Sequence, residues 1–586
     1  MRGVRSVRRC TRLGALASVI LGVAFGHPAL AQQEATRRLA ELVPADVLAY
    51  LELSSPHSLL ERLTAPESRS LLEDLEALAD AEPRKQWGEL RAGVIYVASQ
   101  LGTRPSALIR DLVGGGVAMA VYGPDRIAGW IEARDPDVLR RTHDVVLRLA
   151  RSDPKGSGPQ ASDRDGVTTY KADKLEYALV GRRLVFASDG SILGSVLDRL
   201  AGKPVSENVL AELEAFRGQV AERPKDAWGW AYMDLKRLRQ LDPKAFETKP
   251  DEEAGQVLLF GPWIDGLRTG HWATLAVGPA GPGWSLRLDV SQGQGEATHG
   301  FAGFVPPAGS GPAPLLKPEG TILSVSLYRD WEAVWDTRAD LLPAEAQAGL
   351  AQLDTFAGQF FGGRDFASGV LGSLTPQWRV VVVQHDEAGG PQPGTRLPGF
   401  AVVLGLKPGD EEFATRLTAA FQSFVGLANL GAAQQKAPPL ILGATDVDGV
   451  AVATAAYVPP RESAPGEADV RYNFSPSAAR VGDWFVFAST IQTARRLVPL
   501  LKAEAGNQLL PGVTLAAEGE GAEAARLIGL NRNALRMQRM LEKGQDRQAA
   551  EADLEAFEQL VERLGRARLE VRQIGQATRY ELKVAQ

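Results

Sequence analysis

Short apolar runs separated by polar turns mark the chain as a series of strands and helices. Apolar residues dominate 117–122 and 127–133, and the Gly-Pro-Asp-Arg between them is typical of a turn between antiparallel strands. Helical spacing of apolar residues follows at 138–149 and at 192–200. Further strands are expected at 47–53, 228–233, 271–277 and 284–290. The pattern predicts an α+β class, in which helices pack on a mixed, mainly antiparallel sheet.

The strand pattern repeats along the chain. Residues 178–188 (ALVGRRLVFAS) and 479–489 (ARVGDWFVFAS) are identical at seven of eleven positions with an offset of 301. Other strand patterns recur in the same order, and their offsets drift as loop insertions would cause. We therefore expect two tandem copies of one domain, at 32–304 and 319–586, joined by a Pro/Gly-rich linker at 305–318.

The first residues have the pattern of an export signal. Five arginines precede an apolar stretch at 13–25, and Ala29-Leu30-Ala31 follows as a small-x-small cleavage site. The apolar stretch is too short to cross a bilayer core of about 30 Å as an ordinary helix. The pattern predicts a signal peptide at 1–31, cleavage after Ala31 and a periplasmic or secreted protein. An uncleaved anchor and a twin-arginine export route stay open as alternatives.

Composition narrows the range of partners. The one cysteine, Cys10, lies in the signal, so the mature chain has no disulfide, no cysteine metal site and no thiol nucleophile. Without 1–31, the chain keeps 60 basic and 71 acidic side chains, a net charge of −11. Such a chain is a poor generic ligand for nucleic acid or anionic lipid. No later apolar run is long enough for a membrane span.

One family resemblance rests on the start of the mature chain. Val43-Pro-Ala-Asp46, followed by an apolar strand, resembles the opening of an exported bacterial protein family known only as a domain of unknown function. Members of that family often begin with Leu-Pro-Ala-Asp. The resemblance implies a shared fold over most of the mature chain, and it brings no known catalytic residues.

One polar motif occurs in both halves of the chain and is a candidate metal site. Asp163/Asp165 and Asp446/Asp448 stand in Asp-x-Asp-Gly sequences that could hold Ca²⁺, but neither continues to the distal glutamate of a calcium loop. Asp-Gly also favours hairpin turns, which is the interpretation we adopt.

Ser188 and Ser489 each end a strand before a helix. Neither lies in a Gly-x-Ser-x-Gly sequence, so we expect them to cap helices rather than act as nucleophiles. The glycine run at 114–116 leads into a strand rather than a helix, which favours a loop over a phosphate cradle.

Two apolar features of the sequence have two interpretations each, binding of a ligand or partner and burial within the protein. Trp228 and Trp230 share one face of a strand, where core packing or an interface between the two halves is favoured over a stacking platform for sugars or peptides. An apolar stripe from Leu554 to Leu564 marks a helix. We expect it to pack on the sheet of the second copy rather than dock a partner helix.

The histidines are scattered, and no nucleophile–base pair or metal-ligand spacing is visible. We therefore assign no catalytic, cofactor-binding or metal-binding residue. Two classes of function remain. The favoured one is a non-catalytic extracytoplasmic module for binding or envelope assembly, with an unknown protein or envelope partner. The alternative is a secreted or periplasmic hydrolase whose site is assembled from distant residues.

Overall fold

The structure is a computed structural model. It describes residues 38–54, 56, 81–152, 158–243, 246, 254–292, 301–342, 344–361, 363–384, 392–459, 468–504 and 508–585. The predicted signal peptide, its cleavage site at Ala31 and Cys10 lie outside these residues.

The chain divides into two compact units. Unit 1 comprises Met1–Ala245 and His271–Leu288, and unit 2 comprises Phe246–Gly270 and Asp289–Gln586. Helices and antiparallel strands alternate in both, as the predicted mixed class requires. Among the described helices, none is long and apolar enough to cross a membrane.

Unit 1 is built on antiparallel strands that pair in the order β10–β9–β8–β1–β2–β3–β7–β6–β5–β4. Their bounds are β1 Ala49–Leu53, β2 Gly116–Gly123, β3 Arg126–Glu132, β4 Gln160–Arg164, β5 Val167–Ala172, β6 Leu175–Val180, β7 Arg183–Ala187, β8 Gly229–Asp234, β9 Trp272–Ala280 and β10 Gly283–Ser291. The strands predicted in this half are all present, with ends shifted by a few residues.

Helices cover both faces of this sheet. Their bounds are α4 Ala81–Gln100, α5 Pro105–Val113, α6 Pro136–Ser152, α7 Gly190–Leu200, α8 Glu214–Ala221 and α9 Leu235–Leu241. Val185 of β7 packs with Val196 of α7, whereas the next residue, Phe186, packs with Ile109 of α5. Because successive strand residues point to opposite faces, α7 and α5 lie on opposite sides of the sheet.

Unit 2 has strands that pair in the order β20–β19–β18–β11–β12–β13–β17–β16–β15–β14. Their bounds are β11 Thr321–Tyr328, β12 Leu374–Val383, β13 Gly399–Leu406, β14 Ile441–Val447, β15 Val450–Ala456, β16 Ser477–Val481, β17 Trp484–Ala488, β18 Val513–Glu520, β19 Arg566–Ile574 and β20 Ala577–Ala585. The order of pairing is that of unit 1, with each strand number raised by ten. The repeated segments 178–188 and 479–489 form the matching pairs β6–β7 and β16–β17.

The helices of unit 2 also cover both faces. Their bounds are α10 Ala254–Thr269, α11 Trp331–Asp336, α12 Arg338–Leu341, α13 Ala344–Phe360, α14 Glu411–Gln434, α15 Ile491–Ala503, α16 Gly521–Leu530, α17 Arg532–Lys543 and α18 Arg547–Arg563. Val486 of β17 packs with Leu497 of α15, and Phe485 packs with Phe413 of α14. The β13–β17 pair therefore lies between α15 and α14.

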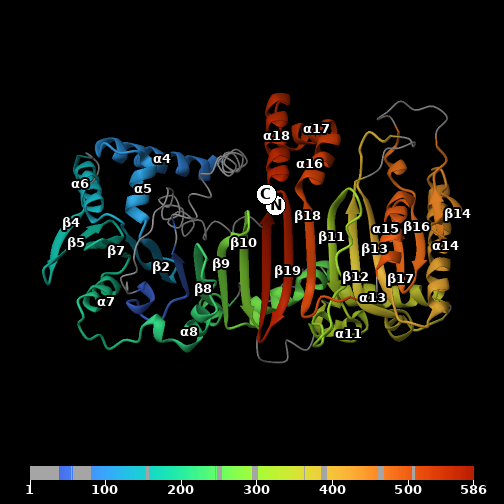
Figure 1. Ribbon diagram of the computed structural model, residues 1–586, viewed down its shortest axis with the longest axis horizontal. Helices are drawn as coiled ribbons and strands as arrows, with labels where there is room; N and C mark the ends of the chain where they lie inside the picture. Colours follow the sequence, from blue (N-terminus) through green and yellow to red (C-terminus); the bar gives the residue numbers. More distant parts are fainter. Residues whose placement is uncertain are drawn as a thin grey trace. The chain divides into compact units, whose positions relative to one another are not determined.

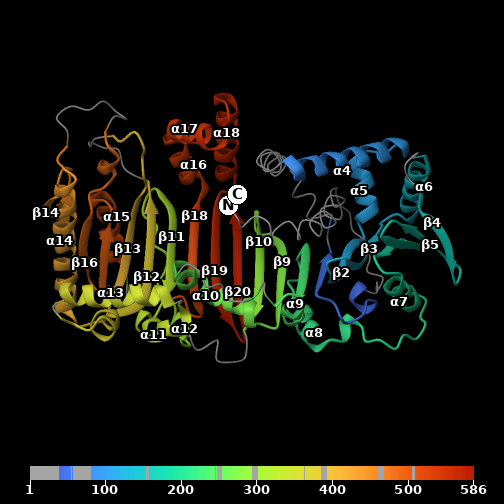
Figure 2. The ribbon, with the colours of Figure 1, turned by 180° about the vertical axis from the view of Figure 1, so that it is seen from behind.

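Helices α16 to α18 form a group beyond one end of strands β18 to β20 (Figures 1 and 2). Helix α18 packs mainly on α16 and α17, and Leu554 is buried there. The prediction that this stripe packs on the sheet is wrong. Helices α16 and α17 provide the apolar surface that covers it instead.

The segment 305–318 is packed within unit 2. Ala313 and Leu316 are buried, and the Leu510 N–H donates to the Pro312 carbonyl at 2.9 Å. A side chain at Gly311 would collide with the backbone at Leu510. This segment therefore forms part of the unit's structure.

Candidate functional site

The repeated Asp-x-Asp-Gly sequences form hairpin turns, as predicted. Asp165 and Asp448 adopt positive φ angles of 53° and 59°, which suit such turns. The Gly166 N–H donates to Asp163 at 3.2 Å, and the Gly449 N–H donates to Asp446 at 2.9 Å. Each first aspartate is thus engaged by its own turn.

The expected capping role of Ser188 and Ser489 is wrong by one residue. Helix α7 is capped by Asp189, and α15 by Thr490, because each helix begins one position later. The two serine hydroxyls instead accept hydrogen bonds from the neighbouring strand, from the Ile127 and Phe400 N–H groups at 2.9 and 2.8 Å. Both serines therefore have a structural role.

The other motifs also have structural explanations. The glycines at 114–116 follow the C-terminus of α5, and a side chain at Gly115 would lie 2.8 Å from the Glu132 carbonyl oxygen. Trp228 and Trp230 are buried, which confirms core packing. His143 lies 3.2 Å from the Tyr177 hydroxyl. Within the described ranges, no three His, Cys, Asp or Glu residues are grouped as metal ligands would be.

The structure adds a cavity that the sequence interpretation missed. This Phe cavity has a volume of about 550 Å³ and lies within unit 2, between α14 and the sheet. Eight of the 19 phenylalanines of the chain line it. The full lining is Phe360, Phe361, Phe366, Phe400, Val402, Leu417, Ala420, Phe421, Phe424, Phe474, Pro476, Ser477, Phe487, Ala488 and Ser489.

Helix α14 supplies one wall through its apolar periodicity. Phe413, Leu417 and Phe421 recur every four residues and are buried against the sheet. Phe424, three residues further on, belongs to the same side of the helix and also lines the cavity, yet it is 66% exposed. The apolar face of α14 thus continues past the point where the protein covers it.

Polar contacts fix the chain at the start of α14. Asp410 accepts a hydrogen bond from the Phe413 N–H at 3.0 Å and from Arg364 at 3.2 Å. Burial alone would raise the pKa of Asp410. The hydrogen bonds from Arg364, Phe413 and Ser373, together with the positive charge of Arg364, outweigh burial and lower this pKa. Arg416 donates to the Phe361 carbonyl at 3.0 Å. The turn that carries Phe361 is therefore tied to α14.

The cavity offers almost no polar chemistry. Among the residues that the structure describes, no charged side chain lines it, and its polar side chains are Ser477 and Ser489. Ser477 donates to the Thr490 carbonyl at 3.3 Å, and Ser489 accepts from Phe400. Since both hydroxyls already have protein partners, the lining presents hydrocarbon to an occupant.

One row of side chains across the sheet, which ends at the cavity, differs in bulk between the two units. In unit 1 the row across β5, β6 and β7 is Tyr170, Tyr177 and Phe186, and the two tyrosine rings stack at 5.2 Å. The matching row in unit 2 is Ala453, Ala478 and Phe487. Ala453 and Ala478 do not line the cavity themselves; they pack in the core beside Phe413 and Phe487, and Phe487 lines the cavity.

The residue that pairs with the phenylalanine of this row also differs between the two units. In unit 1 Phe186 pairs with Gly129, and its ring lies so close that a β-carbon there would be 2.7 Å from it. In unit 2 Phe487 pairs with Val402, which occupies that space. Phe186 is buried, whereas Phe487 stays partly exposed and lines the cavity.

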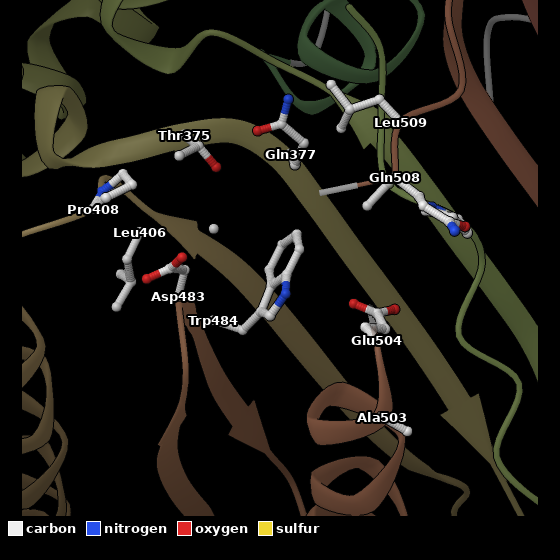
Figure 3. A pocket seen from close by; sticks show the side chains of 13 residues that line it. Thr375, Gln377, Leu406, Pro408, Asp483, Trp484, Ala503, Glu504, Gln508 and Leu509 are labelled. Atoms are coloured by element: carbon white, nitrogen blue, oxygen red, sulfur yellow. The ribbon is translucent and has the colours of Figure 1, made fainter. Parts of the chain in front are cut away.

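A second cavity, of about 410 Å³, lies at the other end of the β13–β17 pair. Figure 3 shows the Trp484 indole within it, with the polar ends of Thr375, Asp483 and Glu504 around the ring. We call it the Trp484 cavity.

Comparisons with known proteins give little. No protein-family model matches the chain, and no curated protein matches it. Among solved structures, crystal forms I, III and IV of TP0453 match with TM-scores of 0.25, 0.25 and 0.24 and identities of 11, 9 and 9%. They cover 45, 45 and 43% of this chain and 82, 83 and 82% of that chain. A similarity at this level carries no argument about function.

Proposed function

We propose that this chain is a non-catalytic binding protein whose unit 2 holds an apolar chain, such as the acyl chain of a fatty acid or lipid, in the Phe cavity. The observation that carries the proposal is the lining: eight of 19 phenylalanines meet at one cavity that has no charged side chain.

The size of the cavity suits a ligand. It opens to solvent beside Phe424, which is 66% exposed. Its volume of about 550 Å³ falls in the usual range of ligand pockets, about 300–1,000 Å³. An apolar chain gains about 0.8 kcal/mol for each methylene that it removes from water.

The lining also determines which part of a ligand the cavity can bind. Because Ser477 and Ser489 have protein partners, no free polar side chain of the lining can bind a head group. The head group therefore stays in solvent, and affinity depends on the chain. Dodecanoate and dodecanol should bind with similar affinity.

The export pattern of 1–31 supports a periplasmic or secreted location, where such a protein would bind acyl chains of the cell envelope. The matching strand order of the two units supports the proposal that they are tandem copies of one domain. The partial exposure of Phe487, where unit 1 buries Phe186, supports the proposal that only the second copy keeps such a site.

A filled cavity tests the proposal. Ala420 lines the cavity on α14, and Ala419 is an exposed neighbour on the same helix. Ala420→Trp should reduce dodecanoate affinity at least tenfold by occupying the space, whereas Ala419→Trp should leave it unchanged. Isothermal titration calorimetry measures both, and circular dichroism checks folding. Equal affinity of the two folded variants would contradict the proposal.

A further inference from the structure

We propose that the Trp484 cavity is a second binding site, specific for a neutral saccharide. Its walls combine an aromatic ring with hydroxyl, amide and carboxylate groups, and it is separate from the Phe cavity.

The polar groups come from several elements of unit 2. Thr375 and Gln377 lie on β12, Asp483 lies in the turn before β17, and Glu504 and Gln508 follow α15. Gln377 donates to the Gly311 carbonyl at 3.2 Å, which ties the cavity wall to the packed 305–318 segment. A site built from separate, mutually bonded elements holds its groups in fixed positions.

A buried arginine fixes the centre of the site. Arg379 is fully buried, and its guanidinium lies 4.0 Å from the centre of the Trp484 ring. The same guanidinium binds both carboxylate oxygens of Glu504, one of them at 2.7 Å. Arg379 therefore covers one face of the indole and neutralises Glu504, while Trp484 also packs on the core beneath α15 and lines the cavity.

This arrangement disfavours charged ligands. An anion would face the Asp483 carboxylate, and the Arg379 guanidinium that could attract it is already paired with Glu504. A cation would seek the π-electrons of Trp484, but these already interact with the Arg379 guanidinium, and two cations across one ring repel each other.

A neutral saccharide matches what remains. The apolar C–H face of a sugar ring can pack on the indole, and its hydroxyls can donate to Asp483 and Glu504 and accept from Gln508. The volume of about 410 Å³ suits a ligand of that size.

The two sites are independent. Trp484 and Phe487 lie three positions apart on β17, so they point to opposite faces of the sheet. The Trp484 cavity lies on the α15 side and the Phe cavity on the α14 side. Blocking the Phe cavity should therefore leave saccharide binding unchanged.

Saturation-transfer NMR of the purified protein with cellobiose, maltose and N,N′-diacetylchitobiose tests the site. We expect at least one disaccharide to bind through its ring C–H protons. Trp484→Leu should reduce its affinity at least tenfold. Asp483→Asn should reduce it about tenfold by removing a charged acceptor. Asp446→Asn, the same change in another turn of unit 2, should have no effect.

Several results would overturn the proposal. These are no binding of any of the three disaccharides, equal binding by Asp483→Asn and Asp446→Asn, or preferential binding of spermidine or sulfate. Asp483 lies in an exposed turn, so its variant is informative even if Trp484→Leu does not fold. Loss of saccharide binding in Ala420→Trp would contradict the independence of the two sites.

Discussion

Replacing Phe424 with alanine gives the most quantitative prediction about the Phe cavity. Full burial of a phenylalanine side chain is worth about 1.5–3 kcal/mol. Phe424 is 66% exposed, so a chain in the cavity would cover about two thirds of the ring and gain about 1–2 kcal/mol from it. Phe424→Ala should therefore weaken dodecanoate binding about 5- to 30-fold.

The matched control lies on the same helix. Leu430 is 64% exposed on α14 but does not line the cavity. Leu430→Ala removes a similar exposed apolar group, so it should leave the dissociation constant unchanged. Calorimetric titration of both variants measures the difference. Equal affinities for Phe424→Ala and the unmodified protein, or equal losses in the two variants, would refute the reasoning.

Three further predictions concern the strand row beside the cavity, the start of α14 and a partly buried carboxyl group of α10. Ala478→Tyr introduces the residue that unit 1 has at this row position. Because Ala478 pairs with the lining residue Phe487, the larger side chain should displace Phe487 and reduce dodecanoate affinity at least tenfold, and tight binding by the folded variant would contradict this. Asp410→Ala should lower the free energy of unfolding in urea by about 0.5–2 kcal/mol at pH 7, because it removes the α14 cap. Since hydrogen bonds and Arg364 outweigh burial and lower the pKa of Asp410, its stabilisation is complete above about pH 4 and is lost as the pH falls through the folded-state pKa. If Asp410→Ala lowers the free energy of unfolding as much at pH 2 as at pH 7, the titration of Asp410 does not contribute to stability as argued. Burial raises the pKa of Asp265 to about 6, although Arg268 partly opposes the shift. The folded state therefore loses stability as the pH rises from about 4 to about 6, so Asp265→Asn should melt above the unmodified protein at pH 7.5 and equal it at pH 4. Identical melting temperatures at pH 7.5 would rule this out.

Much of the fold could be predicted from local patterns. The strands at 117–122 and 127–133 became β2 and β3 because short apolar runs joined by turn residues determine a hairpin locally. The repeat at 178–188 and 479–489 marked matching strand pairs in the two units. Helix caps were missed by one residue, because hydrogen bonds from the neighbouring strand hold Ser188 and Ser489.

The Phe cavity could not be predicted in the same way. Its lining comes from α13, α14, β13, β17 and the residues before β16, which only the tertiary fold brings together. A local signal existed, because Phe360, Phe361 and Phe366 lie close together in the sequence. Phe487 lines the cavity through a tertiary effect, because its neighbours Val402 and Ala478 come from other strands and their pairing depends on strand register.

The central claim is most directly tested by a chain-length series. Decanoate, dodecanoate, tetradecanoate and hexadecanoate should be titrated into the protein below their micelle concentrations. The account predicts that affinity rises about fourfold per added methylene until the cavity is full, and then levels off. It also predicts one site per chain and no such rise in Ala420→Trp. An affinity independent of chain length, or a rise of the same slope in Ala420→Trp, would contradict the account.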